Sequence, residues 1–173
     1  EIAGRQASAV DWRIRIDEAN ATHNDGLPRL ALKMATGSGK TIVMAMLIAW
    51  NTLNKVASPS DKRFAKRFLV VTPGITIRDR LRVLDPTEPG NYYDVRDLVP
   101  AQLRADLGQA QIIITNHHMF CADLALRGGF TGAQALPDYD AVVFDEAHAL
   151  EDVATEFFGV RITRARVDTL VRD

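Results

Sequence analysis

The stretch MATGSGKT, residues 34–41, combines glycines, a lysine and hydroxyl side chains in an order that suits phosphate binding. Its glycines let the backbone turn tightly, so that several N–H groups point at one anion. Lys40 then supplies a mobile positive charge for the outer phosphates, and Thr41 offers a hydroxyl group to Mg²⁺. A glycine turn that merely caps a helix would not explain why a lysine and a hydroxyl residue follow. The residues predicted to bind a nucleotide are Thr36, Gly37, Ser38, Gly39, Lys40 and Thr41.

A second chemical feature is the acidic end of the apolar stretch VVFDEAH, residues 142–148. Ligands of parallel α/β sheets bind at the carboxyl ends of strands, where Asp145 and Glu146 lie. One carboxylate there can hold Mg²⁺ through water, and its neighbour can orient the water that attacks a γ-phosphate. The alternative is a pair of acids that only stabilises the beginning of a helix. Together with the glycine loop, the pair favours phosphate chemistry.

The elements that must position these residues alternate between strands and helices. Strands are predicted over 29–35, 68–73, 111–116 and 141–148, and helices over 40–55, 75–84, 100–108, 117–127 and 150–158, with a surface loop over 85–99. Continuous apolar strands separated by helices indicate an α/β fold, a parallel sheet with helices on both faces. The helix over 40–55 is apolar on nearly all sides and is therefore expected to be buried nearly all round.

Composition limits the classes of protein that this chain can belong to. It has 173 residues, 47% hydrophobic and 25% charged, with a net charge of −1. This composition is typical of one globular domain. Because the net charge is close to zero, the protein as a whole does not attract nucleic acid, so any DNA contact must be a local patch. The single cysteine, Cys121, excludes an internal disulfide framework. We expect a cytoplasmic protein without a membrane partner, and a fragment or processed product because the chain begins at Glu1.

Taken together, TGSGKT and DEAH resemble superfamily two helicases and translocases of the DEAH-box type. The resemblance implies a RecA-like P-loop NTPase lobe that uses ATP and Mg²⁺ to move on DNA. It implies that Lys40 and Thr41 bind phosphate and Mg²⁺, and that Asp145 holds the water shell of the metal. It further implies that Glu146 activates water and that His148 couples hydrolysis to movement. A second RecA-like lobe is the implied partner of this one.

Two parts of the chain resemble two branches of these motors. Residues 30–55, 68–81 and 91–100 look like the motor subunit of type III restriction endonucleases, whereas 114–129 and 137–159 look more like DinG-type or XPD-like helicases. XPD-like helicases often carry an iron–sulfur cluster on four cysteines, which one cysteine cannot hold. The domain organisation expected from the resemblance is a helical lead-in over 1–28, the ATP-binding lobe over 29–159, and the beginning of a further segment over 160–173.

Residues at two other strand ends match family positions that contact a nucleic-acid backbone, without reading its sequence. These residues are Thr72, Pro73, Thr115 and Asn116, and Arg78 on the helix predicted over 75–84 is a further candidate for phosphate contact. Helix capping explains Thr115 and Asn116 equally well. For Arg78, a solvated arginine face is the commoner outcome. We interpret the adjacent His117 and His118 as structural, since no Cys or acid spacing around them makes a zinc site.

Two alternative functions remain open on the sequence. A small P-loop kinase would usually keep a glycine where this chain has Met34, and it would need an arginine-bearing lid that is not identifiable. A nucleotide-binding lobe without turnover is the other alternative. The late arginines Arg161, Arg164 and Arg166 are the internal candidates for a transition-state arginine. An ATPase assay with single-stranded DNA and small-molecule acceptors distinguishes all three.

Overall fold

The structure is a computed structural model that describes residues 17–22, 29–129 and 132–159. The chain forms two compact units, residues 1–38 and 39–173. In the first unit, residues 17–22 are helical, and residues 29–35 are irregular rather than the strand expected from their sequence. A strand is held by ladder hydrogen bonds to a neighbour, and the described part of this unit contains no second strand. The prediction of a strand over 29–35 is therefore wrong.

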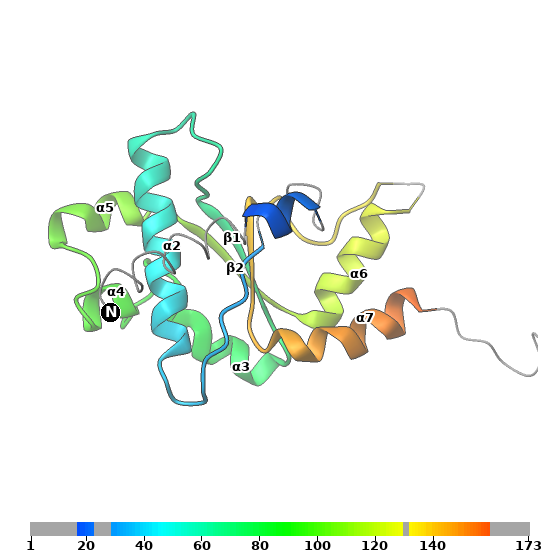
Figure 1. The fold of residues 1–173 in the computed structure, drawn as a ribbon. Coiled ribbons are helices and arrows are strands. Elements are labelled where there is room, and N and C mark those ends of the chain that lie inside the picture. The colour runs from blue at the N-terminus through cyan, green and yellow to red at the C-terminus, as the bar shows by residue number, and fades with distance from the viewer. Residues whose placement is uncertain (1–16, 23–28, 130–131, 160–173) are drawn as a thin grey trace, which may run out of the picture. The chain divides into compact units, whose positions relative to one another are not determined.

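The second unit is built on a parallel sheet of three described strands (Figure 1). These are β1 (Arg67–Thr72), β2 (Gln111–Asn116) and β3 (Ala141–Phe144), in the order β2-β1-β3. In the register, Val70 of β1 lies opposite Ile114 on one side and Val143 on the other. Parallel neighbours need a crossover connection, which the intervening helices provide. The predicted α/β fold with a parallel sheet is confirmed.

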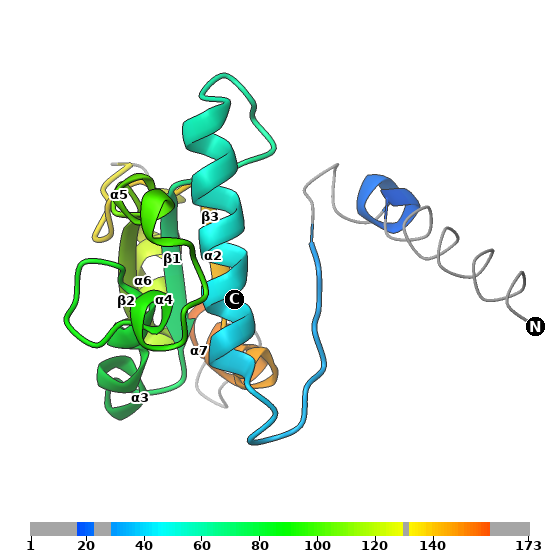
Figure 2. The same cartoon turned by 90° about the vertical axis from the view of Figure 1, so that its left-hand side faces the viewer.

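Helices cover both faces of this sheet (Figures 1 and 2). One layer holds α2 (Lys40–Ala57), α3 (Ile75–Arg80), α4 (Tyr92–Val95) and α5 (Arg104–Leu107), and the other holds α6 (His117–Arg127) and α7 (Leu150–Phe158). Side chains alternate along β1, because successive strand residues point to opposite faces. Phe68 and Val70 pack in the core under α2, while Leu69 and Val71 pack in the core that α6 and α7 cover.

Helix α2 is less buried than its composition indicates. Met46 and Trp50 are 56% and 57% exposed, so the expectation that this helix is buried nearly all round is wrong. The Trp50 ring packs edge-on against Phe64, with ring centroids 5.1 Å apart, which explains how an indole can lie at a surface. No helix in the described ranges is long and apolar enough to cross a membrane.

Three other predicted boundaries differ from the structure. The helix expected over 75–84 continues beyond Arg80 as a 3₁₀ turn, η1 (Leu81–Leu84), and the helix expected over 100–108 likewise begins with the 3₁₀ turn η2 (Ala101–Leu103). The expected loop over 85–99 contains α4, which Tyr93 anchors by donating its hydroxyl to the Leu84 carbonyl at 2.8 Å. The burial of Tyr93 explains why this segment is ordered although its composition is typical of a loop. The ring lies in the core, and the hydroxyl group has a hydrogen-bond acceptor.

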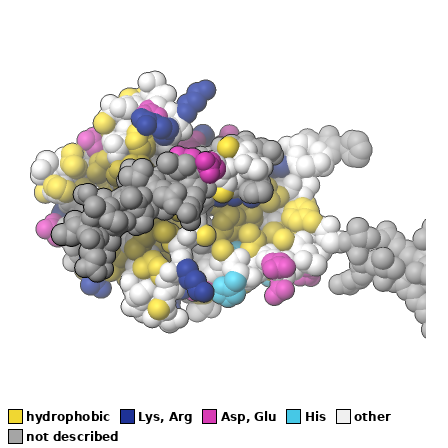
Figure 3. Space-filling view, in the orientation of Figure 1, with side chains coloured by type: hydrophobic (Ala, Val, Ile, Leu, Met, Phe, Trp, Pro, Cys, Tyr) yellow, Lys and Arg dark blue, Asp and Glu magenta, His cyan; other side chains and the backbone are white. Residues whose placement is uncertain are grey.

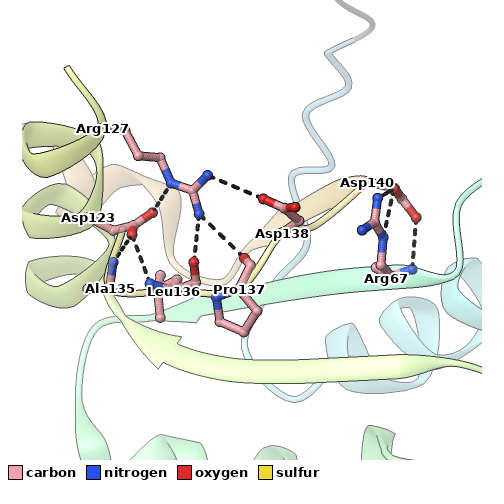
Figure 4. A network of polar contacts seen from close by, with 8 residues as sticks. All are labelled: Arg67, Asp123, Arg127, Ala135, Leu136, Pro137, Asp138 and Asp140. Carbon is pink, nitrogen blue, oxygen red and sulfur yellow. Dashed lines mark hydrogen bonds and ion pairs between the residues drawn. The ribbon is translucent and has the colours of Figure 1, made fainter. Parts of the chain in front are cut away.

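A network of hydrogen bonds and ion pairs joins α6 to the segment that precedes β3 (Figure 4). The Asp123 carboxylate on α6 has no exposed surface and accepts hydrogen bonds from the backbone N–H groups of Ala135 and Leu136, at 2.7 and 2.8 Å. Arg127 donates its Nε to the same carboxylate at 2.6 Å and also bonds the Leu136 carbonyl. Burial alone would raise the pKa of Asp123, but the hydrogen bonds from Leu136, Arg127 and Ala135 lower it below its usual value.

Asp123→Asn is expected to lower the free energy of unfolding by about 2 kcal/mol near neutral pH, because the amide leaves buried donors unmatched. A carboxyl group with a lowered folded pKa stabilises above its unfolded pKa of about 3.9, and this contribution disappears as pH falls through the folded value. The difference between variant and parent should therefore shrink below about pH 4. Urea unfolding between pH 7 and pH 3 measures it.

Asp138→Asn is the matched control, since Asp138 also faces Arg127, at 3.7 Å, but is 66% exposed. Exposed ion pairs contribute little, so this variant should change stability by less than about 0.5 kcal/mol. Equal losses in the two variants would contradict the role given to the buried carboxylate.

Candidate functional site

The strand order of the second unit brings the two chemical features of the sequence together. Lys40 begins α2, Glu146 follows β3, and the Lys40 Nζ donates directly to the Glu146 Oε1 across 106 residues of sequence. This hydrogen bond raises the pKa of Lys40 and lowers that of Glu146. Both side chains keep about a third of their surface exposed, so the pair is accessible to a ligand from solvent.

Glu146 has an unusual backbone conformation. Its φ of 51° lies in the left-handed region, which is uncommon for a residue other than glycine. The residue before it is anchored, because the Asp145 N–H donates to the Val71 carbonyl of β1 at 2.8 Å. The predicted strand over 141–148 therefore ends at Phe144, and the chain turns into η3 (Ala147–Ala149). Such outliers cluster at functional sites, and Glu146 is the residue that accepts the hydrogen bond from Lys40.

The beginning of α2 is open to an anion. Gly39 has a φ of 91° and no side chain caps the helix. The Gly39 carbonyl accepts the N–H groups of Ile42 and Val43, whereas those of Lys40 and Thr41 meet no acceptor among the described residues. Unpaired N–H groups and the dipole of an 18-residue helix favour negative charge at this position.

The other predicted loop residues belong to the first unit. Gly37 has a φ of 77°, and the hydroxyl of Ser38 donates to the Ala35 carbonyl at 2.6 Å. Thr36 and Gly37 form a turn and are exposed. A left-handed glycine is what this turn requires. Ser38 is followed directly in the chain by Gly39, so the turn leads into the beginning of α2.

The Asp145 carboxylate makes no hydrogen bond or ion pair within the part of the chain that the structure describes, and neither does the Thr41 hydroxyl. Among these same residues, no group of three or more His, Cys, Asp or Glu side chains could hold a metal ion. A metal caged by protein ligands alone does not fit this site. Mg²⁺ does fit, because it usually binds through one or two protein oxygens, substrate phosphates and retained water.

His148 lies at the outer side of the same group of residues. Its Nδ1 is 3.5 Å from the Oε2 of Glu146, and its side chain is 79% exposed. Glu146 thus has Lys40 at one carboxylate oxygen and His148 at the other. A protonated His148 also contributes to the lowered pKa of Glu146, after the larger effect of Lys40.

The residues considered for nucleic-acid contact differ in how accessible they are. Thr72 is fully buried, and its hydroxyl donates to the Gly74 carbonyl at 2.9 Å. Asn116 caps α6 by accepting the Met119 N–H at 2.7 Å, which confirms the capping interpretation for this residue. The remaining three are Pro73, which is half-buried, Arg78, which is exposed, and Thr115, which is buried. On the face shown in Figure 3, the described Lys and Arg side chains lie in separate small groups.

His117, which the sequence interpretation treated as structural, lies at the beginning of α6. It is 1% exposed, and neither ring nitrogen has a hydrogen-bond partner among the described residues. Burial lowers its pKa, and the Asp145 backbone acts in the opposite direction. The sequence did contain a signal for a role at the site. His117 directly follows β2, and residues that follow parallel strands lie at the same edge of the sheet, where ligands bind.

Comparisons with known proteins agree with this arrangement. Residues 5–161 match the family described as type III restriction enzyme, res subunit. A protein of Haemophilus influenzae named ATP-dependent DNA helicase YoaA is 34% identical over 73 residues, which are 42% of this chain and 11% of that protein. The Escherichia coli protein of the same name is 31% identical over 78 residues, 45% of this chain and 12% of that protein. No solved structure matches.

The matched segment thus covers about a tenth of those relatives. The family match, by contrast, extends over both chemical features, the glycine loop and the acidic strand end. Together with the parallel sheet flanked by helices, it assigns the chain to a family of helicase-type motors. The chain belongs to the type III restriction enzyme res-subunit family and forms a first RecA-like lobe.

Proposed function

We propose that this chain is the ATP-binding lobe of an ATP-dependent DNA helicase or translocase. The observation that carries the proposal is the contact between Lys40 and Glu146 at the open beginning of α2. A phosphate-binding lysine and a carboxylate that can activate water must reach the same γ-phosphate. The fold places them side by side although the sequence separates them widely.

Each residue of the site has a distinct part in this proposal. The N–H groups at the beginning of α2 and the Lys40 ammonium bind the phosphates, with Thr36, Gly37 and Ser38 completing the loop in sequence. The Thr41 hydroxyl and the Asp145 carboxylate hold Mg²⁺, directly or through water. Mg²⁺, when bound, supplies positive charge at the phosphate oxygens. His148 contacts Glu146 and is proposed to couple hydrolysis to movement.

The direct contact suggests how the basicity of Glu146 depends on the nucleotide. While Lys40 donates to the Glu146 Oε1, the pKa of Glu146 is lowered and the carboxylate is a poor base. Phosphate oxygens compete for the same lysine, since a charge-assisted bond to phosphate replaces the one to carboxylate. Glu146 is then free to orient water and accept its proton. Substrate binding and activation of the base are thus linked through one lysine.

Lys40→Ala tests the phosphate assignment. The variant should bind a fluorescent ATP analogue at least about tenfold more weakly, because a charge-assisted contact to phosphate is lost. Its fold should be unchanged, since Lys40 is a partly exposed side chain outside the core. Circular dichroism and nucleotide titration measure the two properties.

Lys62→Ala is the matched control, because Lys62 is an exposed lysine in the loop between α2 and β1. It should bind the analogue as the parent protein does. Unchanged affinity in Lys40→Ala would remove the phosphate assignment.

The proposals about the substrate, the second lobe and the cellular role rest on the relatives rather than on the geometry of the site. Both curated relatives are named as ATP-dependent DNA helicases, so we propose DNA as the substrate. We propose that the DNA phosphate backbone contacts Pro73, Arg78 and Asn116, since the other candidates, Thr72 and Thr115, are buried. We also propose that residues 29–159 form the lobe, that a second RecA-like lobe completes the motor, and that the protein acts in the cytoplasm, in restriction or repair.

A further inference from the structure

The buried His117 is an unexplained polar group beside the proposed site. An unpaired buried polar atom destabilises the folded state, so native structures rarely retain one without a reason. His117 has two such atoms, Nδ1 and Nε2, on a ring that is 1% exposed. A ring with this exposure cannot satisfy both nitrogens with bulk water. A partner that belongs to the working site would account for them.

The topology shows which partner is at hand. His117 follows β2, Asp145 follows β3, and β1 lies between these two strands. The ends of all three strands are in register, with Asn116 opposite Thr72 and Val71 opposite Phe144. The Asp145 backbone and charge both act on the His117 ring, yet no hydrogen bond of acceptable geometry joins them. The Asp145 carboxylate itself has no partner among the described residues.

Backbone anchors leave the Asp145 side chain as the group that can adjust. Its N–H is fixed to the Val71 carbonyl, and the His117 backbone is held at the beginning of α6, where Asn116 caps the helix. Carboxylates that hold a metal or its water are commonly oriented by a hydrogen bond from a neighbouring group. A neutral imidazole has one N–H to donate.

We propose that His117 is a positioning residue for Asp145, and that one of its ring N–H groups donates to the Asp145 carboxylate when Mg²⁺–nucleotide binds. The inference rests on the proposed function, because it gives Asp145 the role of holding the magnesium or its water shell. It predicts that His117 matters for magnesium and not for the phosphates, which Lys40 and the beginning of α2 bind. The other ring nitrogen remains an acceptor for a bound water molecule.

The test compares magnesium dependence with nucleotide affinity in the 173-residue protein. A fluorescent, non-hydrolysable ATP analogue is titrated in EDTA and then across a range of Mg²⁺ concentrations. In His117→Leu, the half-saturating Mg²⁺ concentration should rise roughly tenfold. This is the lower end of the range observed when a group that orients a metal ligand is removed. Affinity in EDTA should stay within about twofold, because the phosphate contacts are intact.

Conservative and control variants separate positioning from packing. His117→Gln retains an N–H donor and should restore the magnesium dependence to within about threefold of the parent. His118→Leu should change nothing, since the adjacent His118 side chain is 57% exposed. The thermal midpoint of His117→Leu should equal or exceed that of the parent, because leucine removes two unpaired polar atoms. A structural histidine would give the opposite pattern, lower stability with unchanged magnesium dependence, and that result overturns the proposal.

A measurement on the parent protein covers the case in which His117→Leu does not fold. With ¹⁵N-histidine labelling, Mg²⁺–nucleotide should give the His117 ring one N–H that is protected from solvent exchange. A ring N–H that stays unprotected with saturating Mg²⁺–nucleotide overturns the inference. If the analogue does not bind even the parent in EDTA or in Mg²⁺, the proposed function fails, which is a distinct outcome.

Discussion

ATP hydrolysis by the motor that carries this lobe is expected to fall by about two to four orders of magnitude in Glu146→Gln, the scale of losing a general base. The amide keeps the shape of the side chain but cannot accept a proton from water. Asp145 and Thr41 are unchanged, so Mg²⁺–ATP binding should persist. Affinity should even rise, because glutamine competes less strongly than a carboxylate for Lys40, to which Glu146 is bonded.

Steady-state phosphate release and nucleotide titration together measure this separation of binding from turnover. Glu156→Gln is a suitable control, because Glu156 is an exposed carboxylate on α7 whose described neighbour is His118, at 4.0 Å. It should hydrolyse ATP as the parent does. A Glu146→Gln motor with the parental turnover number would remove Glu146 from the mechanism.

The isolated 173-residue chain is expected to bind Mg²⁺–ATP yet hydrolyse it barely above background. A transition-state arginine contributes roughly 10³–10⁵ in rate. In the described ranges, no arginine forms a hydrogen bond or ion pair with Glu146, whose partners there are Lys40 and His148. Several of these arginines pair with acids elsewhere, as Arg67 does with Asp140. Arg161, Arg164 and Arg166 lie outside the described residues. We propose that a second RecA-like lobe supplies the transition-state arginine, as the resemblance to helicase motors implies.

DNA alone should not restore turnover in this chain, because the proposed stimulation closes two lobes on each other. Hydrolysis should be restored when the lobe is assayed within its full-length motor with DNA. The control is Glu146→Gln in that same motor, which should remain inactive. DNA-stimulated turnover of the isolated chain on the order of 1 s⁻¹, an ordinary enzyme rate, would show that the chain completes its own site or dimerises to do so.

Local chemistry and apolar runs were enough to predict much of the second unit. The strand over 111–116 and the helices over 117–127 and 150–158 have the expected bounds, because each is a run of strong formers with a clear end signal. Asn116 was recognisable as a cap, since its side chain acts on a backbone N–H three residues away. The glycine loop followed by Lys40 and Thr41 is likewise a local pattern, which can be recognised without knowing the fold.

Other features depend on neighbours that a linear pattern does not contain. Residues 29–35 alternate as a strand should, but a strand exists only with a ladder partner. The apolar surface of α2 looked buried, yet Met46 and Trp50 are exposed because the described core covers one side of the helix. The end of β3 was misplaced because the left-handed turn at Glu146 is a backbone conformation that its residue type does not favour.

The sequence by itself determined the class of fold and the residues whose chemistry suits phosphate and magnesium. It did not determine which of them meet. Strand order β2-β1-β3 decided that Lys40 contacts Glu146 and that His117 lies beside Asp145. The physical reason is that hydrophobic burial and ladder hydrogen bonds act between segments far apart in sequence, so the tertiary structure alone set these distances.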